Sequence, residues 1–232
     1  MNFELIEEMA GKNIDDIKQI IKSSHSYKYE AIKALGKMNT TESKKALFDL
    51  LSDDDLYVKR AALEECSKIE SKEVLSEIIS NNAYDKKDVN DFLIRTSLLI
   101  IEERSINSLH DFVIKNLDSN NPSTVEYALR AINEIWEDND FNVILKKLGK
   151  ESDEKNKKIY YEVLCNHANN SNWILIYRLI YKNRIPQIRL LACKLLIDNY
   201  TVEFQDDLLR FAKDSDGHIR KLATKYMAQK LV

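Results

Sequence analysis

The stretch LSDDDLYVKRAALEECSKI, from Leu51 to Ile69, has the residue pattern of a turn between two helices. Three consecutive aspartates interrupt an apolar segment, and a second segment begins at Val58 with two basic residues and a pair of alanines. The stretch AKDSDGHIRKLATKYMAQKL shows the same order of residue types, with Ile219 standing 161 positions after Val58. A pattern that recurs at such a distance indicates an internal repeat, which has to be tested before any local motif.

Seven segments follow this pattern when Val58 is taken as an anchor position. Each has a polar break, a β-branched or aromatic anchor, and apolar residues after it, at spacings of 29 to 36 residues. The anchors are Tyr27, Val58, Ile94, Val125, Ile159, Ile188 and Ile219. Four positions later all seven residues are apolar, namely Ala31, Ala62, Leu98, Leu129, Val163, Ala192 and Ala223. Because residues i and i+4 share one helix face, the pattern predicts a buried helix in every segment.

Helix start signals stand three positions before most anchors. Five of these residues have side chains that can accept hydrogen bonds from the free N–H groups of a first turn, namely Ser24, Asp55, Asp91, Asn156 and Asp216. Pro122 and Pro186 also precede anchors, where a helix tolerates proline. These residues predict where the anchored helices begin.

A second amphipathic segment precedes the later anchored helices, as in ESKKALFDLL, SKEVLSEII, SINSLHDFVIKNL, DFNVILKKL, NWILIYRLIY and VEFQDDLLRFA. The unit is therefore helix, turn, helix over about 31 residues. Four glycines and two prolines leave too little turn chemistry for a multi-strand sheet. We predict an all-α fold, an α-solenoid in which about seven antiparallel helix pairs (13–232) follow an N-terminal capping helix (1–12). The pairs are expected to wind into a right-handed superhelix and to form a single domain over 1–232.

The phrase D-x-D-x-x-V-K-x-A-A, from Asp53 to Ala62, resembles the HEAT-repeat family, as does D-x-D-x-x-I-R-x-x-A, from Asp214 to Ala223. The short period is similar to the phycobilisome-lyase type of HEAT-like repeat. The resemblance covers 13–232, and the unit around Ile159 departs most, with Tyr160 where the family has a basic residue. Such repeats imply a protein-interaction scaffold whose second helices line a concave face.

Signatures of several enzyme classes are absent from the sequence. The four glycines are each at least 25 residues from the next, so neither a dinucleotide fingerprint nor a P-loop can form. No histidine belongs to an H-E-x-x-H motif, and Cys165 with His167 is the only close Cys/His pair, which is too few for structural zinc. We therefore predict no catalytic residue, no cofactor and no metal.

The start of the chain, MNFELIEEMAGKN, has no signal-peptide pattern, and no apolar run approaches the roughly 18 residues of a membrane span. Three cysteines without C-x-x-C spacing indicate a reducing environment. We expect a cytoplasmic protein with no membrane partner. The net charge of −3 argues against a nucleic-acid partner.

Two charged features each have a structural and a functional interpretation. The run from Asp53 to Asp55 is either a cation or acid–base site or a helix cap, and recurrence of polar residues at this position favours the cap. One residue after each anchor, five of seven residues are basic, namely Lys28, Lys59, Arg95, Arg189 and Arg220. They either bind phosphate or, as in similar repeats, bridge to acids of the adjoining repeat, and the acidic net charge favours the bridges.

Candidate partner-binding residues come from the position two residues after the anchor, which lies about 200° from it on a helix. This position should be the most exposed on each helix, yet it carries Tyr29, Arg60, Thr96, Tyr127, Tyr161, Leu190 and Lys221. Exposed aromatic and arginine residues are typical of interface anchors. With two nearby basic residues, the predicted partner-binding set is Tyr29, Arg60, Tyr127, Arg130, Tyr161, Leu190 and Lys194. The alternative is that neighbouring repeats cover some of these rings.

The leading hypothesis is a non-catalytic scaffold or adaptor that binds a protein partner on its concave face, as a bacterial toxin-immunity or assembly protein does. No small-molecule substrate is evident. A second hypothesis is a HEAT-like alkylpurine DNA glycosylase, for which Trp136 with Asp138, or Trp173, are the nominated residues. A third is a bilin lyase-like chaperone, which the repeat type alone suggests.

Overall fold

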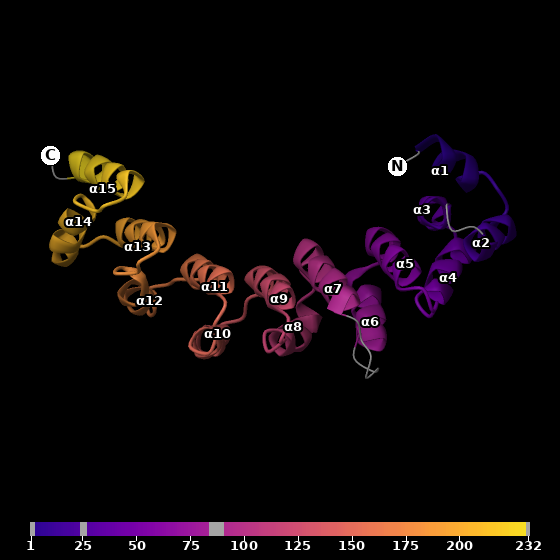
Figure 1. Cartoon of the computed structure of the whole chain (residues 1–232), viewed down its shortest axis with the longest axis horizontal. Helices are drawn as coiled ribbons and strands as arrows, with labels where there is room; N and C mark the ends of the chain where they lie inside the picture. The colour runs from indigo at the N-terminus through magenta and orange to yellow at the C-terminus, as the bar shows by residue number, and fades with distance from the viewer. Residues whose placement is uncertain (1–2, 24–26, 84–90, 231–232) are drawn as a thin grey trace. The chain divides into compact units, whose positions relative to one another are not determined.

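A computed structural model describes residues 3–23, 27–83 and 91–230 of the chain (Figure 1). The regular structure of these residues consists of α-helices and two short 3-10 helices, with no strand among them. The predicted all-α fold is therefore confirmed. The helices group into two compact units, 1–135 and 136–232, which are described separately.

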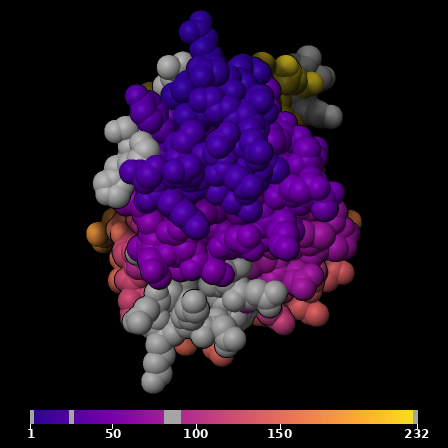
Figure 2. Space-filling view, turned by 90° about the vertical axis from the view of Figure 1, so that its right-hand side faces the viewer, coloured from indigo at the N-terminus to yellow at the C-terminus, as the bar shows by residue number. Residues whose placement is uncertain are grey.

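Unit 1 contains four helix pairs and one extra helix at its start. Each second helix packs on its own first helix, consecutive second helices of the unit pack on one another, and α1 packs on α3. The first helices of the pairs are α2 (Ile14–Ser23), α4 (Thr41–Leu50), α6 (Lys72–Ala83) and α8 (His110–Asn116), the last preceded by η1 (Asn107–Leu109). The second helices are α3 (Lys28–Met38), α5 (Leu56–Ile69), α7 (Asp91–Arg104) and α9 (Pro122–Glu134), and the extra helix is α1 (Phe3–Ala10). The space-filling view shows the indigo and purple residues from the first part of unit 1 packed into a continuous surface (Figure 2).

Unit 2 repeats this plan with three pairs. The first helices are α10 (Asp140–Leu148), α12 (Trp173–Ile180) and α14 (Gln205–Phe211), the last preceded by η2 (Val202–Phe204). The second helices are α11 (Glu154–Asn166), α13 (Pro186–Asp198) and α15 (Gly217–Lys230). Within the unit, α11 packs on α13 and α13 on α15. The predicted repeat of helix pairs is thus present in both units.

The apolar residue four positions after each anchor lies in the core, as predicted. The exposed fraction of all seven side chains is 2% or less, at Ala31, Ala62, Leu98, Leu129, Val163, Ala192 and Ala223. Alanine at four of these positions permits close approach of neighbouring second helices. These seven equivalent residues therefore form part of the core that holds the pairs together in each unit.

The predicted helix starts are confirmed at two positions and corrected at others. The side chains of Asp55 and Asp216 accept hydrogen bonds from first-turn N–H groups. Ser24 lies outside the described residues, and Asp91 is itself the first residue of α7. Pro122 is the first residue of α9, a position that tolerates proline as predicted, and Asn121 caps this helix. Asp153 caps α11, so the N-cap prediction at Asn156 was wrong.

The cap at Asp153 changes the register of α11 by three residues. Asn156 and Tyr160 consequently turn into the core, with exposed fractions of 1%, whereas the predicted anchor Ile159 is half-buried. Tyr27 is also not a buried anchor, because α3 begins at Lys28 and the Tyr27 ring is 50% exposed. Local sequence identifies these helices but not their rotation about the helix axis.

Gly36 of α3 lies directly against Glu65 of α5. A β-carbon added at Gly36 would lie 2.5 Å from Oε2 of Glu65, whose carboxylate is buried and pairs with Lys68. We expect Gly36→Ala to lower the free energy of unfolding by about 1–3 kcal/mol, because α3 and α5 must separate or Glu65 must leave its ion pair. Denaturant unfolding followed by circular dichroism measures this loss.

Gly149 provides a matched control for Gly36. It stands at the end of α10 with φ −63°, and an added β-carbon would make only ordinary contacts, the shortest 3.5 Å. Gly149→Ala is expected to be neutral or stabilising by up to about 1 kcal/mol, since alanine restricts the unfolded chain. A Gly36 variant as stable as the Gly149 variant would show that the close approach does not require glycine.

Candidate functional site

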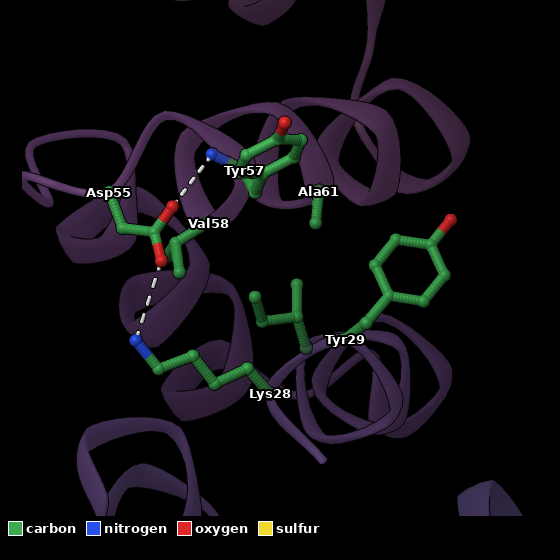
Figure 3. A pocket seen from close by; sticks show the side chains of 7 residues that line it. Lys28, Tyr29, Asp55, Tyr57, Val58 and Ala61 are labelled. Atoms are coloured by element: carbon green, nitrogen blue, oxygen red, sulfur yellow. Dashed lines mark hydrogen bonds and ion pairs between the residues drawn. The ribbon is translucent and has the colours of Figure 1, made fainter. Parts of the chain in front are cut away.

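A groove of about 320 Å³ lies between α3 and α5 in unit 1 (Figure 3). Both helices contribute their first two turns to it, because consecutive second helices pack side by side in the repeat. The lining residues are Lys28, Tyr29, Ile32, Asp55, Tyr57, Val58 and Ala61. The groove thus has charged residues at one end and tyrosines beside an apolar floor.

The charged end is held by Asp55. Its Oδ1 accepts a hydrogen bond from the Tyr57 backbone N–H at 2.9 Å, and its Oδ2 lies 3.5 Å from Lys28 Nζ (Figure 3). Burial raises the pKa of Asp55, but the Tyr57 and Lys28 hydrogen bonds outweigh this effect and hold the pKa below its ordinary value. Asp53 Oδ1 accepts a bond from the Asp55 N–H at 2.8 Å. The aspartate run therefore forms a turn and a helix cap, which confirms the structural interpretation of this run.

The apolar floor of the groove consists of side chains that belong to the repeat core. The exposed fractions of Ile32, Val58 and Ala61 are 1%, 2% and 3%. The rings of Tyr29 and Tyr57 are 42% and 78% exposed and flank this floor (Figure 3). An exposed aromatic pair beside an apolar floor can hold one bulky apolar side chain from a partner.

Polar and aromatic contacts continue from the groove across α3, α5 and α7. Tyr29 OH lies 3.5 Å from Glu64 Oε2, and Arg60 Nε lies 2.6 Å from Glu64 Oε1. The Arg60 guanidinium also lies over the Phe92 ring at 4.6 Å, and that ring meets Tyr57 edge-on at 5.9 Å. Tyr29 and Arg60, two of the predicted partner-binding residues, are thus joined through Glu64 beside Tyr57.

The other predicted residue pair of unit 1 lies on α9. Arg130 donates through Nε and Nη2 to Glu102 Oε1 at 3.0 and 2.9 Å, and its guanidinium lies 5.7 Å from the Tyr127 ring centre. Arg130 is exposed, whereas Tyr127 is half-buried. The structure therefore brings Tyr127 and Arg130 together, with the arginine held by an acid of α7.

The predicted position of greatest exposure is corrected by the structure. Tyr161 and Leu190 are half-buried in unit 2, and Thr96 is 6% exposed and donates to the Phe92 carbonyl at 2.9 Å. Lys194 and Lys221 are exposed. The prediction assumed one buried face on each second helix, but inner helices pack against the preceding pair, the following pair and their own first helix. A partner-binding role for Tyr161, Leu190 and Lys194 stays a prediction.

Sequence reasoning missed Tyr57 and the groove beside it. Tyr57 comes directly before the anchor Val58, and only positions after the anchor were considered for binding. Its sequence signal was a large aromatic residue in the first turn of a helix, next to the cap Asp55. An aromatic residue at that position is a binding candidate only if the neighbouring helix does not cover its ring, and the sequence does not show this.

The basic residues that follow the anchors connect repeats at two places. Lys28 reaches Asp55 of the next pair, and Arg189 forms paired hydrogen bonds with Asp214 at 2.9 and 2.8 Å. Arg220 instead donates to carbonyl oxygens of Asp214 and Ser215, in the turn before its own helix. The predicted bridges between repeats are thus confirmed for Lys28 and Arg189.

Of the three residues nominated for DNA-glycosylase chemistry, Trp173 lies in the interior, Trp136 is half-buried and Asp138 is exposed. Trp173 is 7% exposed and packs on Phe204 at 5.0 Å, so it does not form an accessible wall, whereas Trp136 stacks on His167 at 4.3 Å.

Burial raises the pKa of the thiols to about 12 at Cys66, Cys165 and Cys193. Among the described residues, no group of three or more His, Cys, Asp or Glu side chains could hold a metal ion. No helix within the described ranges is long and apolar enough to cross a membrane.

Comparison with known proteins identifies the repeat in part of the chain. Residues 14–91 match the family model of HEAT repeats, which confirms the resemblance for this segment. A search of curated proteins gave no match.

Two solved structures are similar to most of the chain. One is the complex of CpcE and CpcF of phycocyanin lyase from Nostoc sp. PCC7120, with 14% identity, coverage of 92% of this chain and 82% of that chain, and a TM-score of 0.39. The other is an engineered protein with 16% identity, coverage of 94% and 96%, and a TM-score of 0.35.

Proposed function

We propose that this chain, whose residues 14–91 are HEAT repeats, is a non-catalytic scaffold or adaptor that binds a protein partner through the α3–α5 groove. The observation that carries the proposal is the exposed pair Tyr29 and Tyr57 beside the buried floor of Ile32, Val58 and Ala61. Exposed aromatic side chains beside an apolar groove are a combination typical of binding sites.

The chemistry of the groove favours a protein segment over a reacting substrate. Both oxygens of Asp55 are engaged, one by a backbone N–H and one by Lys28, which suits a structural carboxylate better than a general base. The tyrosines offer large, stiff surfaces with hydroxyl groups that can still bond to a partner backbone. The expected ligand is a segment that places one bulky apolar side chain between the two rings.

The contacts beyond the groove extend the proposed interface along unit 1. Arg60 is held in place by Glu64, so a partner does not have to immobilise a free side chain there. Tyr127 and Arg130 form a second, similarly fixed contact point on α9. The partner-binding set predicted from the sequence is therefore retained for these residues, with Tyr57 added as its central member.

A photo-crosslinking experiment tests the proposal. A benzophenone amino acid replaces Tyr57 in one sample and Lys45, an exposed residue of α4, in a matched control. Cells of the source organism are irradiated, and the crosslinked proteins are identified by mass spectrometry. We expect one protein to crosslink at position 57 and not at position 45.

The affinity of that protein is then compared between variants. The double change Tyr29→Ser and Tyr57→Ser is expected to weaken binding by about 30-fold or more, which corresponds to about 2 kcal/mol for interface hot spots. The melting temperature should stay nearly unchanged, since both rings are exposed. Undiminished affinity in a folded double variant would move the binding surface away from the groove. The identity of the partner distinguishes an immunity protein from an assembly adaptor.

A further inference from the structure

A second surface in unit 2 has a different chemical character from the groove. On α12, three aliphatic side chains are exposed, with fractions of 38% at Ile174, 51% at Leu175 and 43% at Leu179. The opposite face of this helix is already buried, at Trp173, Ile176, Tyr177 and Ile180. Apart from Arg178, the helix therefore carries apolar side chains on both its buried and its exposed sides. An apolar face in this arrangement marks an interaction site.

The charged residues of α12 and of the chain segments on either side of it all have one sign. The 35 residues from Val163 to Ile197 contain no aspartate or glutamate, in a chain where 31% of residues are charged. The same stretch contains five basic residues, Arg178, Lys182, Arg184, Arg189 and Lys194. Arg189 is paired with Asp214, whereas Arg178, Lys182 and Arg184 are exposed and form no ion pair with any described residue. The free positive charges thus lie on α12 and in the turn that follows it.

We propose that the exposed face of α12 binds an acidic amphipathic helix of a partner protein. Leu175 and Leu179 are spaced i, i+4 and form a ridge that fits between the apolar residues of a crossing helix. Aspartate or glutamate residues beside that apolar stripe would reach Arg178, Lys182 and Arg184. The residues of this surface are different from those of the α3–α5 groove. The surface is basic, and the proposed partner helix is acidic.

A second copy of the chain fits this surface poorly. A two-fold contact through α12 would place Arg178 and Lys182 of one copy against the same cationic face of the other, with no acidic residue between Val163 and Ile197 to compensate. An anionic lipid surface also fits less well. The aromatic residues of α12 that would suit a membrane–water interface, Trp173 and Tyr177, are buried in the unit. Three partly exposed aliphatic side chains offer little apolar area for insertion into a bilayer, but they are enough to contact the apolar stripe of one helix.

A peptide selection tests the inference without a known partner. Phage-displayed random peptides of about four helical turns are selected on the immobilised full chain. We expect a class of peptides with acidic residues beside aliphatic residues at i, i+3 or i+4 spacing. Their affinity should fall at least about tenfold both for Leu175→Ser with Leu179→Ser and for Arg178→Gln with Lys182→Gln, which would show that apolar contacts and charges act together.

Two matched variants separate this surface from others. Phe3→Ser removes an apolar side chain of α1 that is more exposed, at 71%, than either leucine, and Tyr57→Ser alters the groove of the proposed function. Neither should affect the acidic peptides, so failure of one proposal leaves the other intact. The inference is overturned if no selected peptide depends on Leu175 and Leu179, or if the dependent peptides are not enriched in acidic residues. It is also overturned if these two leucines are instead required for a dimer in sedimentation velocity or for binding of phosphatidylserine vesicles.

Discussion

Replacement of Tyr160 by alanine is expected to lower the free energy of unfolding by about 3–5 kcal/mol, the range for deletion of a large buried side chain. The Tyr160 side chain is 1% exposed and is among the largest fully buried side chains of the described residues. It lies in α11, which packs on both α12 and α13, so the cavity would weaken two contacts of unit 2. Urea unfolding followed by far-ultraviolet circular dichroism gives the loss.

The neighbouring Tyr161 provides the comparison. It is half-buried on the same helix, so Tyr161→Ala should cost less than half as much as Tyr160→Ala. Equal losses for the two variants would mean that the register of α11, set by the cap at Asp153, is not the one described.

Removal of the Arg189 side chain is expected to cost about 3 kcal/mol of unfolding free energy, because it leaves a buried carboxylate without its partner. The side chains of Arg189 and Asp214 are only 13% and 10% exposed. Arg189 also donates through Nη1 to the carbonyl oxygens of Asn183 and Arg184, at 2.9 and 3.0 Å. One guanidinium therefore fixes the turn before α13 to the turn before α15. Lys194→Ala, which alters an exposed residue of the same helix, should change stability by less than about 0.5 kcal/mol.

The effect of Arg189→Ala should depend on pH. The hydrogen bonds from Arg189 hold the pKa of Asp214 below its ordinary value of 3.8. The ionised carboxylate thus stabilises the folded chain above that value, and this contribution is lost as the pH falls through the lower pKa of the folded state. The stability difference between wild type and Arg189→Ala should therefore be constant near neutral pH and shrink in acid. A difference that stays constant into strong acid would show that the ion pair is not its source.

Local signals in the sequence predicted the helices correctly. The spacing of the seven anchors identified the second helix of each pair. The residues four positions after the anchors, such as Ala62 and Ala223, all lie in the core. This success has a simple cause: an i, i+4 apolar pair and an Asp cap act within one helix and do not depend on its neighbours. The contacts of Lys28 and Arg189 with the next repeat were also predicted, because a repeated sequence places equivalent residues at equivalent contacts.

The tertiary structure alone decided which side chains remain exposed. Each inner second helix is covered from three directions, so Thr96 became buried at a position that helix periodicity assigned to water, while Tyr57 stayed exposed beside the anchor Val58. The sequence offers both Asp153 and Asn156 as caps for α11. In the structure Asp153 is the cap, and the Tyr160 side chain is buried. Sequence periodicity measures the angle between residues on one helix, whereas a binding groove exists only where two helices leave a space between them. The α3–α5 groove and the uncovered face of α12 therefore followed from packing and not from pattern.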